Sequence, residues 1–451
     1  MIWVAGLLLV FVVMLALSLR SPAWFIGPLY GLFVFEQALQ AHFAFFVANR
    51  SFVNLMMAGI VLLLLGYQKA KGELTIKTGP MLAATVGLVL LSILSMAWSI
   101  QPEMTKSFFL RDMRLFLLII VSVPLLVRSM DDAWVAIKSV LLFSVVASIV
   151  LMQSTQVFMR QVVLVGQVTG FGQEGSVRSN PLVVATVAGY AAILTLVVPL
   201  RGLGVVWTIG RFVLFAICLV AIIRTGSRGQ LAAALVVSLV AYPLAHGQAG
   251  MGKKMLATLG SVFVLGLMVF VLGQYARGGR WDLAGGIETY SGTRLGFVGQ
   301  LLAYWAEAGP VAWLLGIGSA AARSPEVLGG VYTHVVAVEV LGELGLVGFT
   351  LLLIVLWRAV YNVRHLLRVC GPSPVLRCTV VGWAALLLFD FMLSFKQGTL
   401  LGSSRLFGSL LMIECMAFLV TRGRWVTADR QVALPDLTAQ PAQPGLPAAV
   451  P

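Results

Sequence analysis

Charged residues are scarce in this sequence. Only 11% of the 451 residues are Asp, Glu, Lys or Arg, whereas 60% are hydrophobic. Soluble domains are about one quarter charged and about one half apolar, so this composition excludes an ordinary soluble protein. Apolar stretches long enough to cross a bilayer as helices recur from the first residues to about residue 421. The sequence therefore predicts an all-α, polytopic membrane protein.

Histidine and cysteine are also rare, with four of each. The cysteines show neither Cys-x-x-Cys spacing nor a disulfide framework, so we interpret all four as inert. They are Cys218, Cys370, Cys378 and Cys415. The segments expected to face outward hold no Asp-x-Asp, no His-x-x-x-His and no carboxylate pair at ligand spacing, so we expect no metal and no other cofactor. The adjacent Asp131 and Asp132 are expected on the inner face.

A basic patch of the kind that binds nucleic acid is missing as well. The formal net charge is +14, but the basic residues are scattered among hydrophobic spans and form no aromatic-flanked patch. We therefore expect membrane lipids and no nucleic acid as partners. The first residues, MIWVAGLLLVFVVMLALSLR, have no basic start and no small-residue cleavage site, which favours a retained first helix over a removable signal.

Hydropathy predicts about 12 to 13 membrane-spanning helices. They cover residues 2–19, 23–40, 52–66, 80–98, 110–127, 133–152, 182–200, 203–222, 229–245, 254–274, 346–360, 376–395 and 404–421. Lysine and arginine cluster in alternate connections, around 69–77, 253–254, 358–377 and 422–430, which the positive-inside rule assigns to the cytoplasm. The outward segments are then 165–181, 224–230, 275–345 and 394–405.

This topology divides the chain into four parts. Residues 1–274 form N-terminal transmembrane helices, 275–345 a long outward loop with short amphipathic helices, 346–425 C-terminal transmembrane helices, and 426–451 a disordered cytoplasmic tail rich in Pro, Ala and Gln. Within the loop, Ser291 or Thr293 is a suitable N-cap for a helix with an apolar stripe at Phe297, Leu301 and Trp305. We expect that helix to lie on the membrane surface.

Arginine is unusually frequent in the outward segments. The connections expected outside, including those around Arg160 and Lys106, hold nine of the arginines against two lysines, Lys106 and Lys396. The arginines are Arg160, Arg178, Arg224, Arg228, Arg277, Arg280, Arg294, Arg323 and Arg405. An individual arginine can simply reach lipid headgroups. As a set they favour an anionic ligand at the outer surface, because the guanidinium fork binds phosphate oxygens bidentately.

Two short motifs place arginines next to helix starts. In RTGSRGQ, Ser227 can cap the following helix or donate a hydrogen bond to a ligand, and Arg228 follows directly. In VRSNPL, Arg178 precedes Asn180 and Pro181, which favour a turn and a helix start. For RTGSRGQ, a loop followed by a helix start without any ligand is the alternative.

The stretch YTHVVAVEVLGELGLVGF brings a histidine and two glutamates to an apolar run. Thr333 is a suitable N-cap, which predicts His334 on the first turn of a helix, on the same face as Gly345. A histidine beside arginines can serve as a general base near neutral pH, although a structural role is the alternative. Glu339 and Glu343 should face arginines or backbone donors, because an unpaired carboxylate in hydrocarbon is costly.

These residues resemble the O-antigen ligase and polymerase family of bacterial inner-membrane proteins. The Arg, three residues, Leu spacing occurs from Arg178 to Leu182, and the His, ten residues, Gly spacing from His334 to Gly345. The runs TGSRGQ, GPVAWLLGIGSA and GELGLVG look like further family signatures, and together the motifs cover about 60 residues.

The resemblance implies a metal-independent, inverting glycosyl transfer at the periplasmic face. The donor would be a glycan on undecaprenyl diphosphate, and the acceptor a hydroxyl of lipid A-core or another glycan. Arg178, Arg294 and His334 would be the catalytic residues, with Arg228, Ser227 and Gly345 binding substrate.

Three functions remain open. An O-antigen ligase acting on lipid A-core is favoured by the two spacings, whereas an O-antigen or exopolysaccharide polymerase would join lipid-linked repeat units. A transporter or flippase of an anionic lipid would show an inverted repeat and polar residues at mid-membrane, and the sequence displays neither.

Overall fold

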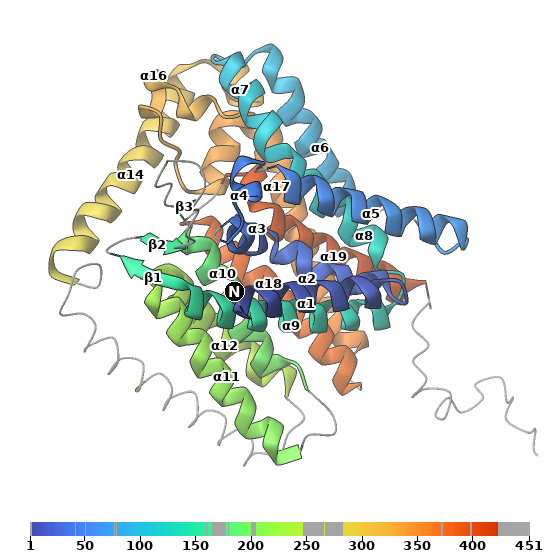
Figure 1. Ribbon diagram of the computed structural model, residues 1–451. Coiled ribbons are helices and arrows are strands. Elements are labelled where there is room, and N and C mark those ends of the chain that lie inside the picture. Colours follow the sequence, from blue (N-terminus) through green and yellow to red (C-terminus); the bar gives the residue numbers. More distant parts are fainter. Residues whose placement is uncertain are drawn as a thin grey trace, which may run out of the picture.

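The computed structural model describes residues 2–40, 42–49, 51–75, 77, 79–158, 161–164, 177–178, 180–199, 204–246, 266, 283–370, 373–396 and 399–422. These residues form a bundle of helices (Figure 1). Among them, seven helices are long and apolar enough to cross a membrane, and three shorter apolar helices accompany them. The prediction of an all-α, polytopic membrane protein is confirmed. The expected span at 254–274 lies outside the described residues except for residue 266, and the tail at 426–451 lies outside them entirely.

The first half of the chain contributes nine helices to the described part. They are α1 (Ile2–Ser18), α2 (Ile26–Tyr30), α3 (Leu32–Gln40), α4 (Ala44–Ala48), α5 (Phe52–Ala70), α6 (Pro80–Leu94), α7 (Pro102–Phe108), α8 (Arg114–Leu126) and α9 (Met130–Ser154). The expected span at 23–40 is broken between α2 and α3, and a π-helical turn at Phe109–Met113 joins α7 to α8.

The second half begins with a small antiparallel sheet that the sequence analysis did not predict, in the order β1 (Thr155–Phe158), β2 (Gln161–Leu164) and β3 (Val177–Arg178). Its helices are α10 (Pro181–Val197), α11 (Gly204–Arg224), α12 (Arg228–Ala245), α14 (Leu283–Glu307), α15 (Pro310–Leu315), α16 (Pro325–Leu328), α17 (Val336–Val369), α18 (Pro374–Ser394) and α19 (Ser404–Thr421).

Helix α10 lies at the centre of the bundle. Every residue from Val184 to Val197 is buried, and α9, α11, α12 and α18 pack against this helix. A helix that is largely apolar on all sides is typical of a protein core or of a membrane span. Peripheral α5 is different, because Leu62 and Leu63 on its outer side are 69% and 75% exposed, as expected for side chains that face lipid.

The helix ends meet at two opposite ends of the bundle. We call one of them the lysine end. It contains Lys77, which donates to the Pro124 carbonyl oxygen over 3.0 Å, and Arg377, which donates to the Leu244 carbonyl oxygen over 2.6 Å. The other end contains His334, and we call it the histidine end. There α7 contacts the segment before α17. Figure 1 shows α7 at this end together with α16, which belongs to that segment. The alternating course of the helices brings these distant segments together.

Helix α14 differs from its prediction. It begins at Leu283, so Ser291 and Thr293 lie inside the helix and neither is an N-cap. Leu301 is fully buried and meets Gly342 of α17, and the Trp305 indole donates to the Ala312 carbonyl oxygen over 2.8 Å. The apolar stripe therefore packs against other helices of the protein, whereas the sequence predicted that it would lie on the membrane surface.

Candidate functional site at the histidine end

His334 does not lie on the first turn of a helix, contrary to the sequence prediction. Helix α17 begins at Val336, with Val335 at the N-cap, and the Thr333 side chain does not cap it. His334 instead adopts a left-handed conformation with φ 63°. This conformation is uncommon for a residue with a side chain, and such residues are typical of tight turns and functional sites. The turn leaves the imidazole partly exposed, just before the helix.

Aromatic and cationic side chains surround the imidazole. The His334 and Tyr332 ring centroids are 3.9 Å apart. The Arg323 guanidinium lies 5.2 Å from the Tyr332 ring centroid and 4.5 Å from that of Phe108 in α7. Cations bind to aromatic faces at such distances, so the two rings orient the guanidinium. The Tyr332 ring thus contacts both the His334 imidazole and the Arg323 guanidinium.

Glu343 positions the segment that carries Arg323. Its carboxylate, buried inside α17, accepts hydrogen bonds from the backbone N–H of Ala320 over 2.7 Å and of Ala322 over 3.2 Å. Glu339, one helical turn earlier, accepts from the Leu400 N–H over 3.3 Å. Both glutamates thus have backbone donors, as the sequence analysis predicted, because a buried carboxylate requires such partners.

Gly345 breaks α17 and joins it to the turn after α15. Its φ of 65° and ψ of −165° are not helical. Ile317 and Gly318 donate their N–H groups to the carbonyl oxygens of Gly342 and Glu343, both over 3.0 Å, in place of the helical donors. A side chain on Gly345 would overlap the backbone of Leu314. Gly345 therefore makes a close contact within the protein itself, and its predicted contact with substrate stays a prediction.

Helices α10 and α12 pack against each other and against α18. Asn180 caps α10 by accepting from the Leu182 N–H over 3.0 Å, which confirms the predicted helix start. Ser227 occupies the N-cap of α12 as predicted, but its side chain makes no capping hydrogen bond. The Ser227 hydroxyl is buried and has no hydrogen-bond partner among the described residues. Such an unsatisfied group is available for a ligand.

A second polar cluster lies between α10, α18 and α19. The Tyr190 hydroxyl donates to one oxygen of Asp390 over 2.6 Å, and the Arg405 guanidinium lies 5.9 Å from the Tyr190 ring centroid. The other Asp390 oxygen and Nη1 of Arg405 are buried without a hydrogen-bond partner. Of this cluster, only Arg405 was singled out in the sequence, as one of the outward arginines.

The two arginines predicted to be catalytic are placed only by their backbones. Arg178 ends β3 immediately before α10, and Arg294 lies in α14, which contacts α17 and α16. The side chains of both lie outside the described residues. Sequence reasoning missed the roles of Tyr332 and Phe108, because neither belongs to a polar motif. It found Arg323 only as a member of the arginine set.

Within the described residues, no group of three or more His, Cys, Asp or Glu side chains is arranged to hold a metal ion. The four cysteines are buried, and none of them forms a disulfide with another. No protein-family model matches this chain, and no curated protein is significantly similar to it.

Proposed function

We propose that this chain is a metal-independent, inverting glycosyltransferase of the bacterial inner membrane whose histidine end faces the periplasm. It moves a glycan from undecaprenyl diphosphate to an acceptor hydroxyl, as an O-antigen ligase acting on lipid A-core. The observation that carries this proposal is the turn at His334, whose imidazole packs on Tyr332, the same ring that, with Phe108, holds the Arg323 guanidinium. Together they supply a base and a positive charge without a metal.

In the proposed reaction, His334 removes the proton of the acceptor hydroxyl. The hydroxyl oxygen then attacks the anomeric carbon of the donor sugar. The bond between that carbon and the diphosphate oxygen breaks, and undecaprenyl diphosphate leaves. Arg178 and Arg294 hold the diphosphate and stabilise its developing charge, because guanidinium forks match phosphate oxygens. Arg323 adds positive charge at the histidine, and Arg228 with Ser227 binds the donor.

The test is a transfer assay with the purified full chain in lipid vesicles. His334→Ala should lower the transfer rate by about 10² to 10⁴, the usual contribution of a general base, while donor binding is retained. His365→Ala is a matched control, because this histidine lies near the lysine end of α17. A His334→Ala variant that transfers glycan at the wild-type rate would leave His334 a packing residue.

The orientation is tested separately by thiol labelling. Glu326 and Arg368 are both exposed and lie towards opposite ends of the bundle, so each can be replaced by cysteine in a chain whose native cysteines have been removed. A membrane-impermeant reagent applied to cells with a permeable outer membrane should label position 326 and not 368. The reverse pattern would place His334 in the cytoplasm and end the proposal.

The acceptor decides between ligase and polymerase. Deleting the protein should leave uncapped core with accumulated lipid-linked polymer if it is a ligase. Single repeat units on core, with no long chains, would identify a polymerase with the same donor.

A further inference from the structure

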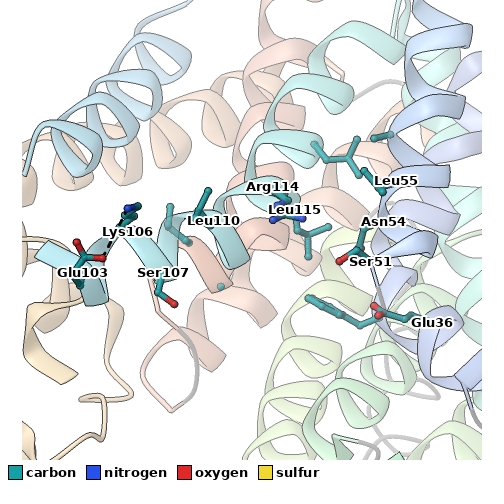
Figure 2. Close-up of a pocket in the computed structure, with 15 residues that line it drawn as sticks. Glu36, Ser51, Asn54, Leu55, Glu103, Lys106, Ser107, Leu110, Arg114 and Leu115 are labelled. Carbon is teal, nitrogen blue, oxygen red and sulfur yellow. Dashed lines mark ion pairs between the residues drawn. The ribbon is translucent and has the colours of Figure 1, made fainter. Parts of the chain in front are cut away.

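A large pocket opens at the histidine end between α3, α5, α7 and α8. Its volume is about 880 Å³, and its polar lining comes from opposite walls. Figure 2 shows Glu103, Lys106 and Ser107 on one wall, Asn54 and Glu36 on the other, and Arg114 between them. None of these residues belongs to the cluster around His334. The proposed reaction assigns this pocket no role.

The polar groups in the pocket suit a phosphorylated sugar. Arg114 is exposed and offers a guanidinium fork for a phosphate. Lys106 makes only a 4.0 Å ion pair with Glu103, and both side chains are largely exposed, so this pair does not occupy the ammonium group. The amide oxygen of Asn54 is buried and has no hydrogen-bond partner in the part of the chain that the structure describes, which leaves it available to a sugar hydroxyl.

The rest of the pocket suits lipid chains. Leu55 and Leu110 at its rim are 64% and 58% exposed, and Leu115 and Leu118 line it further inside. The pocket adjoins helices that cross a membrane, so such leucines face lipid and not water. A pocket with polar side chains on its walls and exposed leucines beside them suits an amphiphile whose lipid chains remain in the bilayer.

The pocket shares two walls with the His334 site. On α7, Glu103, Lys106 and Ser107 line the pocket, whereas the Thr105 hydroxyl donates to the Ser319 carbonyl oxygen over 2.6 Å, next to the segment that carries Arg323. A second wall contains Leu401 and Gly402, which follow the residue whose N–H is held by Glu339. A headgroup in the pocket thus lies one short helix away from the segment before α17.

From these observations we infer that the pocket binds the acceptor substrate, a phosphorylated glycolipid, and presents its sugar towards His334. The phosphate contacts Arg114 and Lys106, sugar hydroxyls contact Asn54 and the carboxylates of the pocket, and the lipid chains lie over Leu55 and Leu110. This inference rests on the proposed function, because it names the acceptor side of the same reaction. It adds a site for the acceptor lipid whose lining residues differ from the arginines proposed to hold the donor.

The experiment measures binding without turnover. The full chain is placed in nanodiscs of phosphatidylcholine, and a fluorescent bisphosphorylated disaccharide lipid is titrated in the absence of donor. The double variant Lys106→Ala with Arg114→Ala should weaken binding by about tenfold or more, because two charge-assisted contacts are lost. Asn54→Leu should weaken it by a smaller factor. The matched control is Arg364→Ala with Arg368→Ala, which removes two exposed cations near the lysine end and should leave binding unchanged.

Unchanged binding in the pocket variants would overturn the inference. The inference would also be overturned if phosphatidylglycerol bound as tightly as the disaccharide lipid and lost as much affinity in the same variants. Such a result would indicate a site for any anionic lipid. In the transfer assay, the pocket variants should raise the KM for the acceptor and leave the KM for the donor unchanged. The two proposals fail separately: a wild-type chain that transfers no glycan refutes the proposed function, whereas active variants with an unchanged acceptor KM refute only the pocket.

Discussion

Replacing Glu343 tests whether one buried carboxylate holds the site together. Glu343→Gln keeps one amide oxygen as an acceptor but turns an NH₂ group towards a backbone N–H, so one of the two hydrogen bonds to Ala320 and Ala322 is lost. Hydrogen bonds to charged groups contribute about 1.5–3 kcal/mol each, and the orphaned N–H adds a further cost. We expect a loss of about 2–4 kcal/mol in the free energy of unfolding.

A matched control lies in α19. Glu414 also accepts two backbone hydrogen bonds, from the N–H groups of Met81 and Leu82, both over 2.7 Å. Glu414→Gln should destabilise the chain by a comparable amount without disturbing the segment that carries Arg323. Equilibrium unfolding in detergent measures both losses. Limited trypsin digestion then measures local release, because cleavage after Arg323 should accelerate in the Glu343 variant only.

Transfer activity completes the test. At a temperature where both variants are folded, Glu343→Gln should reduce transfer strongly, because Arg323 is no longer held next to His334. The Glu414 variant should keep most of its activity. Equal trypsin resistance and equal activity in the two variants would refute the idea that Glu343 positions the site. It would then be one stabilising carboxylate among others.

Three further predictions follow from the same structure. Gly345→Ala should lower the free energy of unfolding in detergent by about 1–3 kcal/mol, because the positive φ and the facing backbone leave no room for a side chain. The control is Gly66→Ala, where the added methyl group meets open space, and it should be neutral or stabilising by up to about 1 kcal/mol. Arg178→Ala and Arg294→Ala should each raise the barrier to transfer by about 2–4 kcal/mol. Lysine at either position should restore activity only in part, and full activity of both lysine variants would contradict the bidentate contact. Burial lowers the pKa of His246, so the folded state favours the neutral imidazole. The contribution of this residue to stability is therefore present above the ordinary histidine pKa of about 6.5 and is lost as the pH falls. His246→Asn should therefore flatten the loss of stability between pH 7.5 and 5.5, and an unchanged slope would show that another group titrates.

The amino-acid sequence alone determined the class of the protein and the positions of most helices. Composition excludes a soluble fold, and within a bilayer the backbone must satisfy its hydrogen bonds inside each helix, so a long apolar run leaves few alternatives. Helix starts such as Asn180 followed by Pro181 were predictable for the same local reason, since the cap and the ring act within a few residues. Backbone donors for Glu339 and Glu343 followed from the cost of an unpaired carboxylate.

The tertiary structure decided the geometry of the site. Locally, the sequence around Thr333 favours a helix that includes His334, yet the helix begins two residues later and the histidine adopts a left-handed turn. The run around Gly345 is helical by pattern, but backbone N–H groups from about 25 residues earlier take over two of its carbonyl oxygens. Such contacts depend on which segments the bundle brings together. Local spacing carries no record of them, because the competing donors come from a distant part of the chain.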